Sequence, residues 1–320
     1  MQMYSVFYKN LFKIVFFFIF VIYIFTTHMY SIDQFSKITN INKLVLRTWE
    51  NRYGLFKASR THTNIRVYSD DLLVQALNIK MLSDNGYKIS FLAKKDYSEL
   101  SKLLEENIDT KNINNSADFY VNKFLEAALN YNVTLFNNTY KKGTEEFGLI
   151  SFYQNVILST FSKIGLFWLT NRINPGQEHF LSELMKQKIL TSIDKSTSII
   201  SQSKNWLLFL PPSEYHEIGL IFAKLLLIQN GYEVIYLGAN VPLESLDHIA
   251  SKKSIDNILF FSVSNFSKKN TMKNIEYINS IFKKSKKFLV SDVETDPNKM
   301  KKTKTHHISN INQFLDLIQK

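Results

Sequence analysis

The stretch WLLFLPPSEYHEIG, residues 206–219, joins a short apolar run to a loop that carries an acid, a histidine and a glycine. Three further apolar runs follow it: EVIYLG at 233–238, NILFFSVS at 257–264 and KFLVSDV at 287–293. Helical patterns separate the runs, and such alternation predicts a parallel sheet of βα units over residues 204–320. Ligands of these sheets bind beyond the carboxyl ends of the strands. We therefore expect His216 to lie at that edge.

Three other regions precede this one. Residues 1–28 contain twelve consecutive apolar residues, IVFFFIFVIYIF at 14–25, fewer than the ~20 that a membrane-spanning helix needs. We interpret residues 1–28 as an apolar leader, either a mis-assigned start before Met29 or a weak membrane anchor. Residues 29–100 are basic, with short helices around a turn-rich segment. Residues 118–200 contain only helical patterns, which favour a four-helix bundle.

Composition limits the classes of function. The chain has 320 residues, a net charge of +11 and an apolar fraction of 45%, which suffices for several domains. The positive charge fits a polyanionic partner, either nucleic acid or an anionic membrane, and fits equally a general bias toward Lys in the composition, so charge alone favours neither interpretation. Cysteine is absent from the sequence, which excludes disulfides and cysteine-ligated zinc or iron–sulfur sites. His306 and His307 lie in a stretch rich in Lys and Thr, where we expect them to be solvated.

The segment LRTWENRYG, residues 46–54, has the chemistry of a DNA-binding helix. On a helix, Arg47 and Arg52 project guanidinium groups that pair with guanine edges or phosphates. Leu46 and Trp49 pack inward in the same helix. The segment that follows lacks helical periodicity and is predicted to form a turn or wing. It carries donors suited to phosphate contacts, namely Arg60, Asn64, Arg66 and Tyr68.

This region resembles the winged helix-turn-helix domain of MerR-family transcription regulators. The matching stretches are VLRTWENRYGLFKASRTHTNIRVYS at 45–69, which includes Tyr53, and MLSDNGYKISFLAK at 81–94. The resemblance implies that residues 29–100 bind double-stranded promoter DNA and bend it as part of a homo-oligomer, a dimer or a tetramer. Many metal-sensing members of the family use cysteines after this domain, and this chain has none.

The loop after the first apolar run resembles the D/E-x-H-x-x-G motif of cobalamin-binding domains. Glu214 can accept a hydrogen bond from one imidazole nitrogen of His216, which leaves the other nitrogen for a metal. The resemblance implies that His216 is the lower axial ligand of cobalt, and that Gly219 lets the cofactor approach the start of the helix. It extends to YLGANVP at 236–242 and SVS at 262–264, and so implies cofactor contacts from Gly238, Val241, Pro242, Ser262 and Ser264.

A second match lies in the helical region. Trp168 precedes the pair Glu178-His179 by ten residues, and this spacing resembles light-sensing regulators of the CarH and LitR type. In those regulators the three residues cover the upper face of cobalamin around the adenosyl group, and an indole plane suits such a ligand. Two positions depart from the patterns. Leu169 stands where the regulators carry a His that ligates cobalt after photolysis, and Ser291-Asp292 stand where cobalamin domains carry Gly-Gly.

These matches predict a multidomain protein with a winged helix-turn-helix, a four-helix bundle and a Rossmann-like, flavodoxin-like cobalamin-binding domain at residues 204–320. The predicted function is a cytoplasmic transcription repressor, and not an enzyme, whose DNA binding or oligomerisation responds to adenosylcobalamin and to light. Two alternatives stay open. One is a MerR-type regulator that has lost cobalamin and responds to a protein partner, and the other is a corrinoid carrier protein for methyl transfer. A membrane is a partner only if the apolar leader is real.

Overall fold

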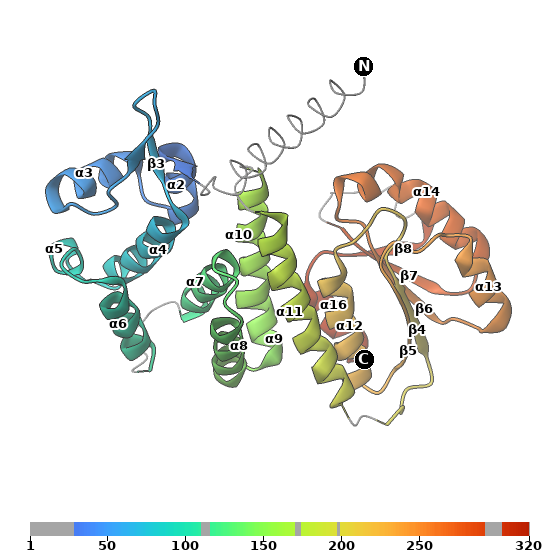
Figure 1. Ribbon diagram of the computed structural model, residues 1–320. Helices are drawn as coiled ribbons and strands as arrows, with labels where there is room; N and C mark the ends of the chain where they lie inside the picture. Colours follow the sequence, from blue (N-terminus) through green and yellow to red (C-terminus); the bar gives the residue numbers. More distant parts are fainter. Residues whose placement is uncertain (1–28, 110–115, 170–173, 197–198, 292–302, 320) are drawn as a thin grey trace, which may run out of the picture. The chain divides into compact units, whose positions relative to one another are not determined.

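The computed structural model describes residues 29–109, 116–169, 174–196, 199–291 and 303–319 (Figure 1). The chain divides into two compact units, residues 1–181 and 182–320, and each is described by itself. The apolar leader predicted at residues 1–28, with the membrane contact that depends on it, lies outside the described residues. Among the described helices, none is both long and apolar enough to cross a membrane.

The first unit begins with a winged helix-turn-helix, as predicted. Its elements are β1 (Tyr30–Ser31), α2 (Ile32–Thr39), α3 (Lys43–Tyr53), β2 (Ser59–Arg60), β3 (Arg66–Tyr68), α4 (Asp70–Asp84), α5 (Ile89–Leu92) and α6 (Tyr97–Asp109). The three strands pair antiparallel in the order β1-β3-β2. The hydroxyl groups of Ser31 and Ser69 cap α2 and α4, and Gly54 ends α3 in the left-handed conformation.

An aromatic core holds the wing and α3 in place. Phe35 of α2 stacks on Tyr68 of β3 with ring centroids 4.3 Å apart, and Phe56 packs against Phe35 at 5.9 Å. Leu46 is the buried residue of α3. Removing these apolar surfaces from water is the main term that stabilises the arrangement, because burying one such side chain contributes about 1.5–3 kcal/mol.

Helices make up the rest of the first unit, as predicted. They are α7 (Ser116–Leu129), α8 (Val133–Phe147), α9 (Leu149–Phe152), a π-helical turn (Tyr153–Ile157), α10 (Leu158–Leu169) and α11 (Pro175–Asp194). From Ser182 onward α11 belongs to the second unit. Helix α7 is the centre of the group, because every side chain from Phe119 to Leu129 is buried.

The second unit is an α/β fold in three layers. Its strands are β4 (Asn205–Phe209), β5 (Glu233–Gly238), β6 (Asn257–Phe261), β7 (Lys286–Val290) and β8 (Thr305–Ile308). Its helices, besides the end of α11, are α12 (Glu217–Gln229), α13 (Ser245–Lys252), α14 (Asn265–Ile281) and α16 (Ile311–Ile318). The strands are parallel in the order β5-β4-β6-β7-β8. In chain order this is the flavodoxin-like arrangement 2-1-3-4-5, which confirms the predicted fold class.

Helices cover both faces of this sheet (Figure 1). On one face, Leu246 of α13 and Ile275 of α14 share a buried cluster with Phe260 of β6. On the other face, α12 and α16 lie over the sheet, and Trp206 of β4 meets Phe314 of α16 with ring centroids 6.0 Å apart. The hydrophobic core therefore lies on both faces of the sheet at β4 and β6. The ends of the strands, in contrast, stay exposed.

Strand β8 was not predicted. Its four residues, THHI, form a strand only because they pair with the neighbouring β7, where tertiary context outweighs local preference. His306 and His307 are exposed on it, as expected from the sequence.

Candidate functional site

The loop that carries Glu214 and His216 lies at the carboxyl end of β4, at the point where the strand order reverses. The neighbours of β4 are β5 on one side and β6 on the other; the chain reaches β5 through α12 on one face of the sheet and then β6 through α13 on the opposite face (Figure 1). Ligands of doubly wound sheets bind in the crevice at such a switch point. The predicted position of His216 at the sheet edge is therefore where the fold places it.

A buried carboxylate organises this edge. Glu214 has no exposed surface, and its Oε2 accepts hydrogen bonds from the backbone N–H groups of Val263 and Ser264, both at 2.7 Å. Its Oε1 accepts from the N–H groups of Tyr215 and His216 at 3.1 and 3.2 Å. Hydrogen bonds from N–H groups favour the charged form of a carboxylate and hold it in place. Glu214 thus ties the loop after β4 to the loop after β6.

The same carboxylate orients the His216 ring. Nδ1 of His216 lies 2.6 Å from Oε1 of Glu214, while 67% of the His216 side chain is exposed. A carboxylate at Nδ1 sets the tautomer with hydrogen on Nδ1 and raises the basicity of Nε2, which is how metal-ligating histidines are commonly supported. The pair is thus arranged to offer Nε2 to a ligand at the sheet edge.

The loop after β5 completes the edge. The N–H of Asn240 donates to the carbonyl of Glu214 at 3.1 Å, and the side-chain oxygen of Asn240 accepts from the N–H of Ser213 at 2.9 Å. Both residues have positive φ, 54° and 65°, in a conformation that few residues other than Gly and Asn adopt readily. Val241 is buried, and Pro242 is exposed. Two predicted contact residues therefore lie in a loop that is bonded directly to the Glu214 segment.

Glu217, which follows His216, begins α12 and lies beside β5. Its Oε1 accepts a hydrogen bond from Tyr236 at 2.8 Å, and its Oε2 pairs with Nζ of Lys186 on α11 at 3.2 Å. Burial and then the bond to Glu217 raise the pKa of Tyr236. Gly238 has φ +82°, and a Cβ there would lie 3.2 Å from Oε1 of Glu217. A side chain at position 238 would therefore be both strained and crowded.

The remaining predicted cofactor residues have protein neighbours. A Cβ at Gly219 would lie 2.7 Å from Cε2 of Phe261, so this glycine makes room for an aromatic ring of the protein itself. Ser262 is buried, with its hydroxyl 2.6 Å from that of Thr271. The Ser264 hydroxyl donates to the carbonyl of Ser213 at 3.1 Å. Ser262 therefore holds α14 to the sheet, and Ser264 holds the loops together.

The predicted upper cap is only partly described. Glu178 is half-buried and His179 is exposed, in the first turns of α11. The side chains of Trp168 and Leu169 lie outside the described residues, as does Asp292. Ser291 is buried after β7, and its carbonyl accepts a hydrogen bond from Nε2 of His307 at 2.8 Å. A role for these residues around a cofactor stays a prediction.

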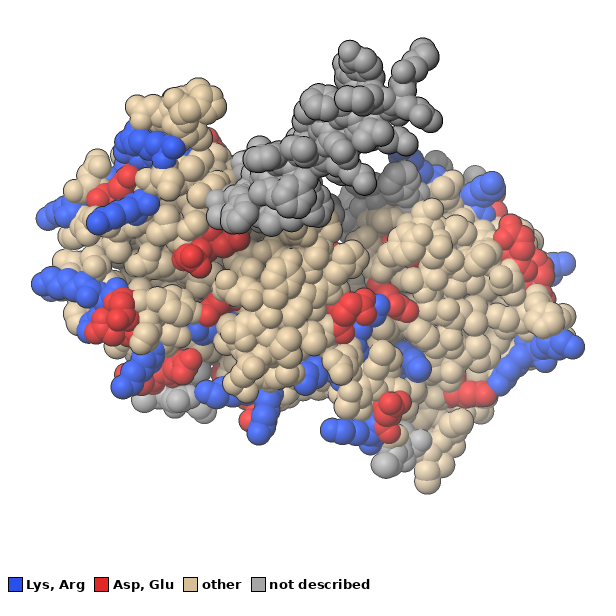
Figure 2. Space-filling model, viewed as in Figure 1, with Lys and Arg blue, Asp and Glu red and all other residues tan. Residues whose placement is uncertain are grey.

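The predicted DNA-binding residues lie on α3 and on the wing. Arg47 and Arg52 are exposed on α3, and the Arg52 guanidinium lies 5.4 Å from the ring centre of Tyr53. Trp49 is half-buried and packs against Phe56. Lys and Arg side chains stand out along the edge of the molecule that carries α3 (Figure 2). This helix therefore offers cationic side chains on a well-anchored surface.

The wing is a tight hairpin between β2 and β3. Arg60 donates to the side-chain oxygen of Asn64 at 2.9 Å, and Asn64 has φ 63° at the turn. Arg66 pairs with Glu50 of α3 at 2.7 Å, so it fixes the wing to the helix. The expectation that Tyr68 offers its hydroxyl to phosphate needs correction. Its side chain is only 1% exposed, because its ring stacks on Phe35 in the core.

Some exposed residues of α3 were missed by sequence reasoning. Leu44, Thr48 and Asn51 are exposed on the helix, and Leu44 has 71% of its surface in water. They stand three or four residues apart and so share a face with Arg47. Helical spacing from Arg47 was the signal that could have found them.

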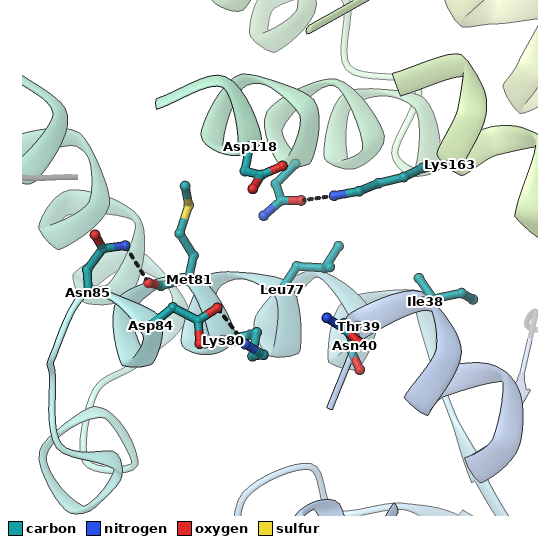
Figure 3. Close-up of a pocket in the computed structure, with 11 residues that line it drawn as sticks. Ile38, Thr39, Asn40, Leu77, Lys80, Met81, Asp84, Asn85, Asp118 and Lys163 are labelled. Carbon is teal, nitrogen blue, oxygen red and sulfur yellow. Dashed lines mark hydrogen bonds and ion pairs between the residues drawn. The ribbon is translucent and has the colours of Figure 1, made fainter. Parts of the chain in front are cut away.

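A cavity of about 400 Å³ lies in the first unit between α2, α4, α7 and α10 (Figure 3). Lys80 pairs with Asp84 on its wall, and Lys163 donates to Asn122 at 3.3 Å. Burial lowers the pKa of Lys163, and the nearby Asp118 opposes that change. The cavity thus separates the helices of the winged region from those of the bundle. The two lysines that line it, Lys80 and Lys163, lie near the carboxylates of Asp84 and Asp118.

The chain is similar to proteins of known type in both of its units. Residues 30–95 match the MerR HTH family of regulatory proteins. The chain is 24% identical over 221 residues to the HTH-type transcriptional repressor CarH of Myxococcus xanthus, which covers 68% of this chain and 73% of CarH. It is 22% identical over 217 residues to the repressor CarA of the same organism, covering 67% of this chain and 70% of CarA.

A solved structure shows the same fold. The monomethylamine corrinoid protein of Methanosarcina barkeri superposes with a TM-score of 0.50 at 14% identity, over 61% of this chain and 94% of that protein. At this identity the likeness concerns the fold alone. Residues 30–95 therefore form a MerR-type HTH domain, the chain is similar to the repressors CarH and CarA over about two thirds of its length, and it shares the fold of this corrinoid protein.

Proposed function

We propose that this protein is a cytoplasmic transcription repressor whose binding to promoter DNA, or whose oligomerisation, is controlled by adenosylcobalamin and by light. In this proposal residues 29–100 bind DNA, residues 118–200 cap the cofactor, and residues 204–320 hold it. The protein works as a homo-oligomer, a dimer or a tetramer, and it does not turn over a substrate. The repressors CarH and CarA, to which the chain is similar over two thirds of its length, support this assignment.

One observation carries the cofactor assignment. The buried Glu214 holds Nδ1 of His216 at 2.6 Å at the switch point of the sheet, while most of the His216 side chain is exposed. This is the support that a histidine ligand of a metal needs, and the site lies where this fold class binds ligands. The donor set therefore fits a corrinoid whose cobalt takes one histidine from the protein.

The proposal gives each group a role. His216 supplies Nε2 as the lower ligand of cobalt, and Glu214 orients it. The loop residues after the strands border the cofactor, namely Gly238, Val241, Pro242, Ser262 and Ser264, while Gly219 opens the start of α12. Trp168, Glu178 and His179 cover the upper side. Adenosylcobalamin supplies a cobalt–carbon bond that visible light breaks.

The test is a single substitution. Protein purified in the dark with adenosylcobalamin is expected to co-elute with a corrin absorption band, and His216→Ala is expected to lose the cofactor or hold it far more weakly. His248, on α13, gives a matched control, because His248→Ala removes an exposed imidazole of the same unit. Equal cofactor retention and identical spectra for wild type and His216→Ala would refute the assignment.

The two alternatives predict different outcomes. A corrinoid carrier for methyl transfer is favoured by the fold shared with the corrinoid protein, but it gives no reason for the winged region. It predicts a cofactor whose presence leaves DNA affinity unchanged. A regulator that has lost cobalamin is favoured by the buried Ser291 in place of glycine. It predicts that wild type elutes without a corrin band.

A further inference from the structure

The carboxylate of Glu217 connects three elements of the second unit. It belongs to the first residue of α12, it accepts a hydrogen bond from Tyr236 of β5, and it pairs with Lys186 of α11. The side chains of Glu217 and Lys186 are only 20% and 25% exposed. A pair that is shielded to this degree is screened less by salt than a surface pair.

The surroundings of Glu217 hold its carboxylate in one place. Lys224, on the same helix, lies 5.1 Å from the ring centre of Tyr236, so the ring is held between α12 and its own strand. Gly238 leaves no Cβ in the way of Oε1. The negative charge also lies at the N-terminus of α12, where the helix dipole favours it. Glu217 therefore cannot shift without moving the start of α12.

We propose that Glu217 is a positioning residue that couples the His216 loop to helix α11 through Lys186. The proposal rests on the proposed function, because the signal it transmits is the ligand state of His216. Glu217 follows His216 directly in the chain, so a movement of the His216 backbone also moves the residue that carries this carboxylate. Lys186 passes that movement to α11, a helix of twenty residues whose first turns carry Glu178 and His179.

Helix α11 is a suitable carrier for such a movement. A continuous helix advances 1.5 Å per residue and is stiff over this length, so a shift at Lys186 displaces the helix rather than one side chain. Glu183, one turn earlier, also pairs with Lys186, at 3.0 Å, but its side chain is 65% exposed. That second pair lies within α11 and orients the lysine along its own helix.

The experiment compares variants of the full chain by two measurements. The first is the visible spectrum with adenosylcobalamin in the dark, which reports histidine ligation of cobalt. The second is the ratio of DNA affinities with and without the cofactor, which reports coupling. Lys186→Met removes the charge and keeps the length, Lys186→Arg restores the charge, and Glu183→Gln is the matched control. Tyr236→Phe removes the other hydrogen bond without changing any charge.

Lys186→Met is expected to keep the wild-type spectrum while the coupling ratio falls at least about fivefold, the lower end of typical allosteric coupling. Lys186→Arg should restore the ratio, Glu183→Gln should leave it unchanged, and Tyr236→Phe should lower it less. Coupling in Lys186→Met within twofold of wild type would overturn the inference, as would an equal loss in Glu183→Gln. If Lys186→Met fails to fold, an unchanged ratio in Tyr236→Phe overturns it.

Failure of the proposed function gives a different result. A wild-type protein that binds no cobalamin removes both the function and the coupling. A wild-type protein that binds cobalamin through His216, but whose DNA affinity does not respond, retains the cofactor site and overturns both the control of DNA binding and the coupling. A wild-type protein whose DNA affinity responds to cobalamin, with an equal response in Lys186→Met, overturns the coupling alone.

Discussion

Arg52 and Lys102 have the same charge but lie in different surroundings. Arg52 is exposed on α3 beside Arg47, whereas Lys102 lies on α6, with 79% of its side chain exposed. If Arg52 contacts a base edge, Arg52→Ala should weaken operator binding by about 1–3 kcal/mol. Lys102→Ala should change it by at most about 0.5 kcal/mol, as is usual for a surface substitution. Fluorescence anisotropy with labelled operator DNA measures both, and equal losses would contradict a specific role for α3.

Leu169 sets an expectation for illuminated protein. A leucine side chain has no lone pair, so it cannot act as a second ligand of cobalt beside Trp168. Illumination of cobalamin-loaded wild type is expected to leave a spectrum with a single histidine ligand, and the cofactor should be lost on gel filtration. Leu169→His is expected to give a two-histidine spectrum that survives the column. A stable two-histidine spectrum in wild type would point to His179 instead.

Two glycines in the helices of the first unit allow a test of packing by one substitution. A Cβ at Gly143 of α8 would overlap Cε2 of the buried Phe152, whereas a Cβ at Gly165 of α10 would meet no other part of the protein within 4 Å. Gly143→Ala should therefore lower the free energy of unfolding by about 1–3 kcal/mol through overpacking. Gly165→Ala should raise it by about 0.5–1 kcal/mol, because alanine is the better helix former. Urea denaturation decides, and effects of the same sign would contradict the packing described here.

Ligand linkage gives a prediction for the whole molecule. A cofactor that binds only the folded protein stabilises it by about 2.7 kcal/mol at a concentration one hundred times its Kd. Saturating adenosylcobalamin in the dark should therefore raise the Tm of wild type, and His216→Ala should show no such rise.

The affinity of wild type and of His216→Ala for DNA should fall steeply as the salt concentration rises, because phosphate contacts release counterions. A salt-independent affinity would contradict DNA binding through the α3 and wing surface.

Much of the fold could be predicted from the sequence, because local patterns of residues determine which segments form helices and strands. The alternation of apolar runs with helical stretches gave the parallel sheet, and the motif around Trp49 identified the winged helix-turn-helix. The E-x-H-x-x-G pattern located Glu214 and His216 at the edge of the sheet. These features depend on the spacing of residues along the chain, which the sequence contains directly. The short strand β8 was missed, since its four residues become a strand only beside β7.

The tertiary structure decided what spacing cannot show, namely which distant groups meet. The two N–H groups that bind Oε2 of Glu214 come from residues about fifty positions away. The stacking of Tyr68 on Phe35 and the pairing of Arg66 with Glu50 also join separate elements. Lys186, Glu217 and Tyr236 carry no motif, and they became a unit only when α11, α12 and β5 packed together. The sequence by itself determined the types of domain and the candidate ligand histidine, whereas folding determined the orientation and the connections of that histidine, because these depend on contacts across the core.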